Sequence, residues 1–167
     1  ATYFVIWYYQ PILSRLGIPI LWFGFFHLFL VGAEMVVAAN FSRWVRMAGS
    51  AENYMKWSAI LAGAGFMVVI LFPHIVTLIV FLALSGGFGL TRIQFMSAHM
   101  NKHIQSHNRA TVLSAISMFR RFALVVLNPF MGLLADKSLF AAIFVVGLLP
   151  FVTLLIGKKG KFSRGEF

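Results

Sequence analysis

The sequence predicts an all-α fold, a polytopic membrane helical bundle, on the basis of its composition, its hydropathy and the pattern of its apolar runs. Hydrophobic residues make up 60% of the 167 positions and charged residues 11%, against about 25% charged residues in a typical soluble domain. The mean hydropathy is +0.89, so a soluble domain of this size could not bury its apolar surface. The apolar runs lack the alternation of membrane barrel strands and therefore indicate helices.

Six hydrophobic segments can be drawn, which predicts about five full transmembrane helices and a truncated first one. The first segment contains Pro11, is followed by Gly17, and is shorter than the about 20 residues that cross the hydrocarbon layer. Pro73 marks the turn between the third and fourth segments, and the strings AGAGF and LSGGFGL within these two predict close helix packing. The expected segments are 1–13, 18–39, 57–72, 75–98, 110–135 and 138–156.

The basic residues predict the orientation, since Lys and Arg are enriched on the cytoplasmic side of membrane proteins. The outward side holds Arg15 and Lys137. The inward connections and the tail hold Arg43, Arg46, Lys56, Lys102, Arg109, Lys158, Lys159, Lys161 and Arg164. We therefore expect an integral protein of the plasma (inner) membrane, with a transmembrane domain at 1–157 and a basic cytoplasmic tail at 158–167.

The net charge of +10 does not indicate a nucleic-acid partner. The basic residues lie at helix ends and inside helices, whereas a nucleic-acid interface needs them along one soluble face. The charge is better explained by the membrane orientation.

Two adjacent arginines, Arg120 and Arg121, interrupt the fifth apolar segment. At 1.5 Å per residue they lie roughly 15–17 Å from its inner end, close to the membrane midplane. A charge at that depth costs at least about 2.5–3.5 kcal/mol and therefore faces a partner or a watery cavity. Arg121 shares one helical stripe with Ser114, Ser117 and Asn128, which predicts a substrate-binding face. A salt-bridge network that only locks the helices together is the alternative.

The second and fourth segments carry polar residues at matched depth. His27 and Glu34 are seven residues apart and share a face of the second segment. Glu34 and Arg92 lie roughly 24 and 26 Å from the outer ends of their helices, so an ion pair is the least costly way to bury both. Alternatively, Glu34 is a proton carrier. His27 either lines the substrate site or is satisfied by a neighbouring carbonyl.

Three histidines, His99, His103 and His107, follow one another at intervals of four residues. On a continuous helix they would share a face and could hold a metal, so a membrane-embedded metalloenzyme is one alternative function. The stretch has no carboxylate ligand and no H-E-x-x-H motif. No Ser-x-x-Lys, G-x-S-x-G or paired-carboxylate arrangement occurs either. We therefore expect no metal, no cofactor and no enzymatic activity.

The chain resembles the C-terminal half of a major facilitator superfamily transporter over nearly its whole length, and two stretches carry the resemblance. YFVIWYYQPILSRLGIP, at 3–19, looks like the outer end of the first helix of the C-terminal half. NRATVLSAISMFRRFALVVLNPFMGLLADKSLF, at 108–140, looks like the penultimate helix of that half. The chain departs from the family at Asn128, where many relatives have Gly. The connection NFSRWVRMAGSAENY also lacks the G-x-x-x-D-R-x-G-R string that is common after the second helix of a half.

The resemblance implies that the chain is the C-terminal six-helix half of a secondary transporter, which moves a small solute by alternating access. In that design the first, second, fourth and fifth helices of a half line the cavity. The implied lining includes His27, Glu34, Arg92, Arg120 and Arg121. The expected partners are a small anionic solute, protons as the coupling ion, the N-terminal six-helix half and the lipid bilayer. A non-transporting membrane scaffold is a further alternative.

The orientation can be tested directly because the chain has no cysteine. Single cysteines introduced as Arg15→Cys and Lys161→Cys should react with a membrane-impermeant maleimide from opposite sides, because the basic side of the chain is held in the cytoplasm. Labelling of intact cells and of inverted vesicles measures this. Reaction of both cysteines from the same side would contradict the orientation.

Overall fold

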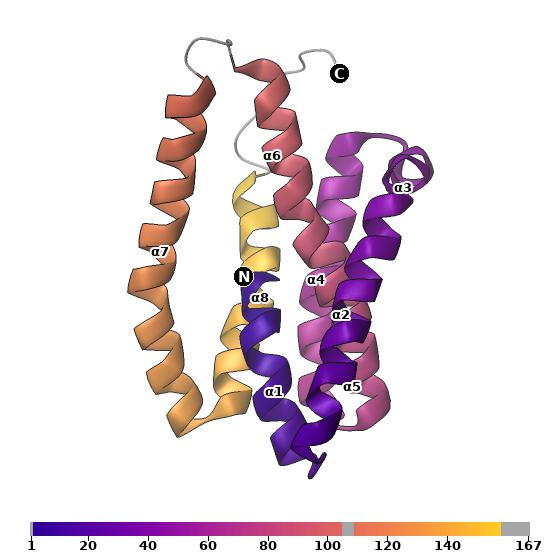
Figure 1. Cartoon of the computed structure of the whole chain (residues 1–167), viewed down its shortest axis with the longest axis vertical. Helices are drawn as coiled ribbons and strands as arrows, with labels where there is room; N and C mark the ends of the chain where they lie inside the picture. Colours follow the sequence, from indigo (N-terminus) through magenta and orange to yellow (C-terminus); the bar gives the residue numbers. More distant parts are fainter. Residues whose placement is uncertain (1, 105–108, 158–167) are drawn as a thin grey trace.

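The structure is a computed structural model that describes residues 2–104 and 109–157. Within these ranges every regular element is helical, as the sequence predicts. The long helices run up and down along one axis (Figure 1). The elements are η1 (Thr2–Phe4), α1 (Val5–Arg15), η2 (Ile20–Trp22), α2 (Phe23–Ala39), α3 (Phe41–Ala48), α4 (Ala51–Leu71), α5 (Ile75–Phe81), η3 (Leu82–Leu90), α6 (Thr91–His103), α7 (Arg109–Lys137) and α8 (Leu139–Gly157).

Four helices in the described part of the chain are long and apolar enough to cross a membrane. They cover Ile20–Ala39, Ala51–Leu71, Ile75–Ala98 and Ala110–Lys137. The described apolar part of the last helix, Leu139–Val152, is shorter. A polytopic helical membrane protein is therefore what the structure supports, and the finer count of about five full spans stays a prediction. The first helix is short, as expected, with 11 residues in α1.

Helix α4 begins at Ala51, earlier than the segment predicted from hydropathy. The Ser50 hydroxyl accepts a hydrogen bond from the backbone N–H of Asn53 at 3.1 Å and thereby caps the helix. Glu52 and Lys56 then lie one turn apart and form an ion pair of 2.6 Å on the surface. This first turn is polar, so hydropathy alone does not detect it, although a cap and an ion pair stabilise it.

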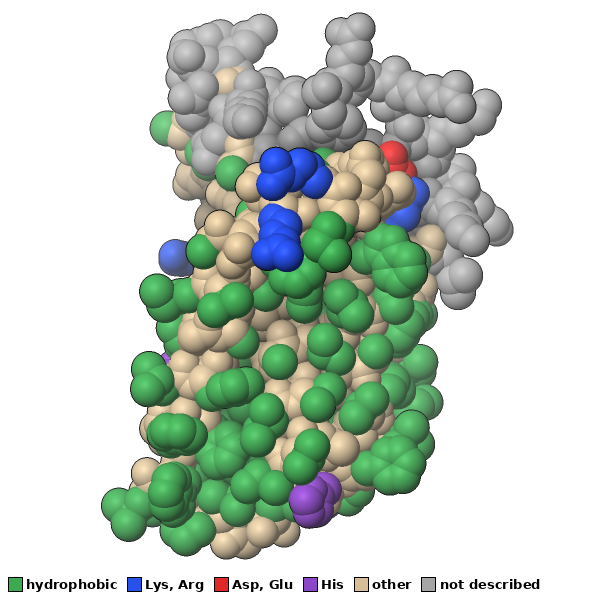
Figure 2. Space-filling view, turned by 90° about the vertical axis from the view of Figure 1, so that its right-hand side faces the viewer, with side chains coloured by type: hydrophobic (Ala, Val, Ile, Leu, Met, Phe, Trp, Pro, Cys, Tyr) green, Lys and Arg blue, Asp and Glu red, His purple; other side chains and the backbone are tan. Residues whose placement is uncertain are grey.

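The connection between α2 and α4 forms the short helix α3, where the sequence indicated only a loop. Its Trp44 packs edge-on against Phe88 of η3, with ring centroids 5.2 Å apart, while Arg43 and Arg46 are exposed. Figure 2 shows Lys and Arg side chains gathered toward the end of the bundle at which α3 lies, and hydrophobic side chains over most of the remaining face. Helices with one apolar and one basic face lie along membrane–water interfaces.

The turn between α4 and α5 occurs where the sequence predicts it. Nδ1 of His74 accepts a hydrogen bond from the backbone N–H of Val76 at 3.3 Å. The Thr77 hydroxyl accepts one from the backbone N–H of His74 at 3.1 Å. These two bonds satisfy backbone donors at the start of α5 and explain why the chain restarts as a helix directly after Pro73.

Helix α2 approaches closely at η3, a π-helical segment of nine residues that joins α5 to α6. A Cβ atom added at Gly86 would lie 2.2 Å from Cδ1 of Leu30 in α2. One added at Gly87 would lie 3.3 Å from the carbonyl oxygen of Ala33 in the same helix. The close packing predicted from LSGGFGL is therefore confirmed, and glycine is what allows α2 to lie against η3.

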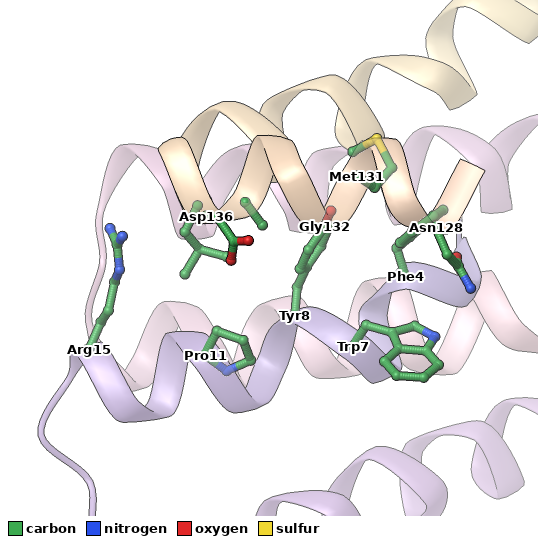
Figure 3. Close-up of a pocket in the computed structure, with 11 residues that line it drawn as sticks. Phe4, Trp7, Tyr8, Pro11, Arg15, Asn128, Met131, Gly132 and Asp136 are labelled. Atoms are coloured by element: carbon green, nitrogen blue, oxygen red, sulfur yellow. The ribbon is translucent and has the colours of Figure 1, made fainter. Parts of the chain in front are cut away.

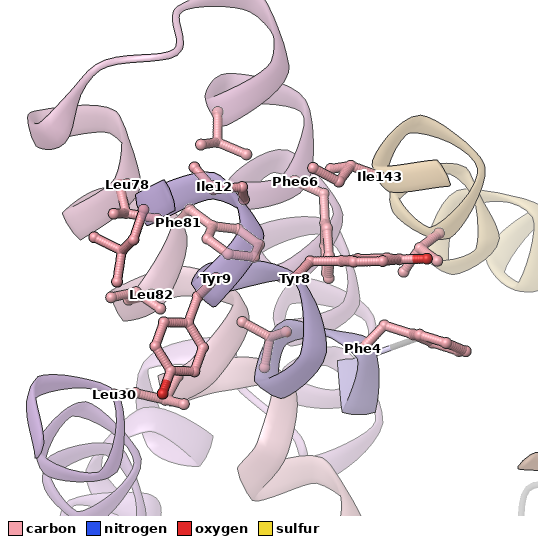
Figure 4. Close-up of a cluster of buried hydrophobic side chains, with 14 of the residues drawn as sticks. Phe4, Tyr8, Tyr9, Ile12, Leu30, Phe66, Leu78, Phe81, Leu82 and Ile143 are labelled. Carbon is pink, nitrogen blue, oxygen red and sulfur yellow. The ribbon is translucent and has the colours of Figure 1, made fainter. Parts of the chain in front are cut away.

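The core extends from η3 to α1, α4 and α8. The buried Ser85 hydroxyl donates a hydrogen bond to the carbonyl of Ala62 in α4 at 2.8 Å. Phe66 and Phe81 pack edge-to-face, with centroids 4.9 Å apart. Figure 4 shows Tyr9 of α1 in the same cluster of buried side chains. The short α1 is thus held by apolar packing against the helices that follow it.

Helix α7 is packed unlike the other long helices. No residue in the most apolar 18-residue stretch of α7 is buried, whereas half of the residues in the corresponding stretch of Ile75–Ala98 are. It lies along one edge of the molecule and meets α8 near the turn that joins them (Figure 1). Phe119, Phe122 and Phe130 are 75%, 65% and 66% exposed. A surface this apolar needs lipid or another protein segment against it.

The packing of α8 on α4 generates a stability prediction at Gly147. A Cβ atom there would lie 2.8 Å from Cβ of Phe66, which is fixed to the α4 backbone and cannot swing away. Gly147→Ala should therefore destabilise the protein by about 1–3 kcal/mol. In the matched control Gly32→Ala the new Cβ meets nothing within 4 Å, and the helix should gain slightly. Thermal unfolding in detergent micelles measures both, and equal melting temperatures would contradict the prediction.

Candidate functional site

His27 of α2 is hydrogen bonded to α1. Its Nδ1 lies 3.2 Å from the Tyr9 hydroxyl, and the two rings stack with centroids 6.0 Å apart. Nε2 of Gln10 donates to the same hydroxyl at 3.2 Å. Both bonds are satisfied when the Tyr9 oxygen accepts from Gln10 and donates its proton to Nδ1, which leaves the proton of a neutral His27 on Nε2. The exposed imidazole edge can then donate to a group beside it.

Glu34 lies two turns further along the same face of α2. Nε2 of Gln94, in α6, donates a hydrogen bond to Glu34 Oε1 at 2.7 Å. No ion pair joins Glu34 to Arg92 in the part of the chain that the structure describes, so the predicted partner is replaced by Gln94. Arg92 and Gln94 are two positions apart and therefore about 200° apart around the helix. When Gln94 faces α2, Arg92 points to the other side.

These residues form a polar track along one side of the membrane-spanning helices, which consists of Tyr9, Gln10, His27, Glu34 and Gln94. Gln10, His27 and Gln94 are exposed and Glu34 is half-buried. Polar and ionisable groups on a spanning helix are costly against lipid tails and normally face a water-filled cavity or a partner. The track can donate and accept hydrogen bonds at two levels, one at His27 and one at Glu34.

Arg92 is half-buried in α6 and does not belong to the polar track. The preceding Thr91 donates a hydrogen bond to the carbonyl of Gly87 at 2.8 Å. Its hydroxyl also lies 3.4 Å from the Tyr54 hydroxyl of α4. Arg92 therefore follows directly on the point where the π-helical segment meets α4.

The predicted stripe on α7 is separate from the polar track. Ser114, Arg120 and Arg121 are exposed and Ser117 is half-buried. No hydrogen bond or ion pair connects the stripe to the polar track among the described residues. The structure thus gives two polar surfaces on different helices and does not bring all the predicted site residues together.

The lower end of the α7 stripe faces α1. Asn128 and Gly132 line a pocket whose opposite wall is α1 (Figure 3). Arg121 precedes these residues by seven and eleven positions, which are nearly whole numbers of α-helical turns. It therefore shares their face, while Arg120 is turned by about 100° from it. Asn128 is the predicted site residue that lies in a defined pocket.

The histidine cluster falls outside what the structure describes. His107 and the side chains of His99 and His103 are not among the described residues. Among the side chains that are described, no group of three or more His, Cys, Asp or Glu could hold a metal ion. The metal alternative is therefore not tested at the cluster itself.

Sequence reasoning missed Tyr9, Gln10 and Gln94. These uncharged residues carry less cost in a membrane than the charged ones, so they draw less attention in a hydropathy scan. A signal was present all the same, because Gln10 and Gln94 are amides inside otherwise apolar runs. Which amide meets which acid depends on helix rotation, which the sequence pattern alone does not provide.

Comparison with known proteins gives no assignment. No protein-family model matches the chain, and neither a curated protein nor a solved structure is significantly similar to it. The function has to be argued from the residues and their geometry.

The Glu34–Gln94 contact predicts a specific energetic coupling. A double-mutant cycle with Glu34→Ala and Gln94→Ala should give a coupling of about 1 kcal/mol, because the bond has a charged acceptor but lies on an exposed face. The matched cycle with Glu34→Ala and Arg92→Ala should be additive. Chemical unfolding in micelles measures both cycles. Coupling at Arg92 with none at Gln94 would contradict the geometry and restore the ion pair.

Proposed function

We propose that the chain is the C-terminal six-helix half of a secondary transporter of the major facilitator type, which moves a small anionic solute across the plasma (inner) membrane by alternating access. The observation that carries the proposal is the polar track, a row of hydrogen-bonding and ionisable side chains on the short α1 and on the candidate membrane-spanning helices, of which Gln10, His27 and Gln94 are exposed. Such a row favours a water-accessible cavity over a lipid contact.

The proposal requires a second wall for the cavity. His27 and Gln94 of the polar track and Ser114 and Arg121 of the α7 stripe are exposed in the described chain, so neither surface is stable against lipid tails without water and a facing protein segment. An N-terminal six-helix half supplies that segment in the proposed transporter, because such halves enclose the substrate between them. The basic α3 surface and the tail face the cytoplasm in this arrangement.

In the proposed mechanism Arg121 binds the anionic group of the solute. Its guanidinium stays charged and can hold a carboxylate or phosphate through two parallel hydrogen bonds. It lies near the middle of the 29-residue α7 and on the helix face that is turned toward α1. Ser114, Ser117 and Asn128 on the same stripe add hydrogen-bonding groups around the solute.

The polar track supplies groups that can carry protons. Glu34 is an ionisable carboxylate whose described hydrogen bond comes from the neutral amide of Gln94, so protonation of Glu34 does not break an ion pair. His27 lies two turns away on α2 and is connected to Tyr9 and Gln10. A proton taken up at Glu34 neutralises its charge while the cavity changes its side of opening, which couples transport to the proton gradient.

A non-transporting scaffold is the second candidate. The hydrogen bonds of His27 to Tyr9 and of Glu34 to Gln94 join α2 to α1 and α6, as a purely structural network would. Arg120 and Arg121 favour transport instead, because both are exposed and an inert scaffold gains nothing from two charges at that depth.

Replacement of the two arginines distinguishes these functions. In proteoliposomes of the complete transporter, Arg121→Lys should lower solute-driven proton uptake by about tenfold or more while the protein stays inserted, because Lys loses the bidentate grip. Arg120→Lys, the matched control, should have a smaller effect. A pH-sensitive dye in the lumen and a panel of small carboxylates and phosphates provide the measurement. Normal uptake by Arg121→Lys, or the reverse order, would contradict the assigned face, and no uptake by any solute would favour the scaffold.

A further inference from the structure

A pocket of about 450 Å³ lies between α1, the last part of α7 and the start of α8. Its volume is in the range of small-molecule sites, and its lining is mainly apolar with a few polar groups, as such sites are. Phe4 of η1 and Trp7 and Pro11 of α1 form much of one wall, and Met131 and Gly132 belong to the α7 wall (Figure 3). The pocket lies at the end of the bundle opposite to α3.

One acidic group in the pocket has no counter-charge. Asp136 is exposed and, among the described residues, forms no ion pair. Its carboxylate is directed into the space between α7 and α1 (Figure 3). It belongs to the last turn of α7, which ends at Lys137, where the free carbonyls of the helix add negative potential. The carboxylate and the free carbonyls together make this part of the α7 wall negative, although the basic Lys137 follows directly in the same turn.

The nearest basic group of the lining is engaged elsewhere. Arg15 stands at one end of the pocket, and its Cζ lies 5.3 Å from the ring centroid of Phe140 in α8. This cation–π contact lies at the end of the pocket, and Arg15 forms no ion pair with Asp136 in the described chain.

The wall of the pocket also contains an unsatisfied polar atom. Tyr8 is 5% exposed, and its hydroxyl is buried without a hydrogen-bond partner in the described structure. The side chain extends from α1 toward α7 beside Gly132 (Figure 3). Buried hydroxyls are normally paired, so this unpaired hydroxyl is an unfavourable feature of the contact between α1 and α7.

Aromatic rings complete the environment of the carboxylate. The rings of Phe4 and Tyr8 are stacked with centroids 5.7 Å apart, and Trp7 is 58% exposed beside them. Aromatic faces attract ammonium groups, most strongly when the cation is partly desolvated. An acid beside aromatic faces suits one chemical class, an organic cation.

We propose that this pocket binds a small organic cation, an ammonium compound with an apolar or aromatic body, with its charge at Asp136 and its body against Trp7 and Phe4. The pocket shares Asn128 with the proposed solute-binding stripe on α7, but binding of the cation needs neither Arg121 nor the polar track. This site prefers a cation, whereas the midplane arginines prefer an anion.

Benzyltrimethylammonium is a suitable probe, titrated calorimetrically into the full chain in lipid nanodiscs. Binding should be saturable, and Asp136→Asn should weaken it about tenfold or more, because a charge-assisted contact is lost. Gly132→Leu should abolish it, because a Cβ at Gly132 meets nothing within 4 Å and the new side chain can fill the pocket. This variant also decides the question if Asp136→Asn fails to fold.

Matched controls separate the pocket from general effects. Glu52→Gln removes an acid on the surface ion pair with Lys56, and Gly24→Leu places the same bulk at another open helical glycine; both should bind the cation as the unaltered chain does. Arg121→Lys should also leave binding of the cation unchanged. A failure of the transport proposal can therefore be distinguished from a failure of the cation proposal. Three results would overturn the proposal. They are non-saturable binding, binding by Asp136→Asn and Gly132→Leu equal to that of the unaltered chain, and tighter binding of benzenesulfonate than of benzyltrimethylammonium.

Discussion

The contact of α2 and α4 with the π-helical segment η3 determines how α6 lies against α2 and thus where Glu34 meets Gln94. Gly86 and Gly87 let the backbone of η3 approach α2, and Ser85 ties the segment to the Ala62 carbonyl of α4. A π-helix bonds residues five apart and has a wider turn than an α-helix, so α6 leaves it with a changed rotation. That rotation turns Gln94 toward Glu34. The Glu34–Gln94 part of the polar track therefore depends on a packing feature that is itself mainly apolar.

The described chain has a well-packed side and an open side. The core of α1, α4, η3 and α8 buries large side chains such as Phe66 and Phe81, while none of the apolar window of α7 is buried. Lipid satisfies the exposed phenylalanines of α7 but not Arg120 and Arg121 on the same helix, because these charges need water or a protein partner. One helix thus has to meet two environments. A boundary between lipid and an aqueous cavity fulfils this requirement, and so does an interface with a second helical unit.

The helical class and the approximate position of the segments were predictable because apolar length is a property of the sequence. The start of α4 and the existence of α3 were not, since a Ser50 cap and the packing of Trp44 on Phe88 stabilise stretches that are too polar for a hydropathy scan. For Glu34, the depth along the helix could be derived from the sequence, and the predicted partner Arg92 lies two residues from the observed partner Gln94. The rotation of α6, which decides between these two residues, could not be derived because it depends on η3. The pocket at Tyr8 and Asp136 unites residues from opposite ends of the chain, which no local pattern indicates.

Helix α7 carries charges of opposite sign that act independently. Arg121 and Asp136 are separated by roughly 22 Å along the helix at 1.5 Å per residue, well beyond the screening length of about 8 Å in physiological salt. A pocket of about 450 Å³ cannot hold a ligand that reaches both. A cation bound at Asp136 contacts both α1 and α7. It therefore stabilises every conformation in which these two helices form the pocket. A ligand shifts a conformational equilibrium only by its difference in affinity between the states. If movement of α7 away from α1 opens that end of the cavity, the cation favours the closed state without competing for the arginine.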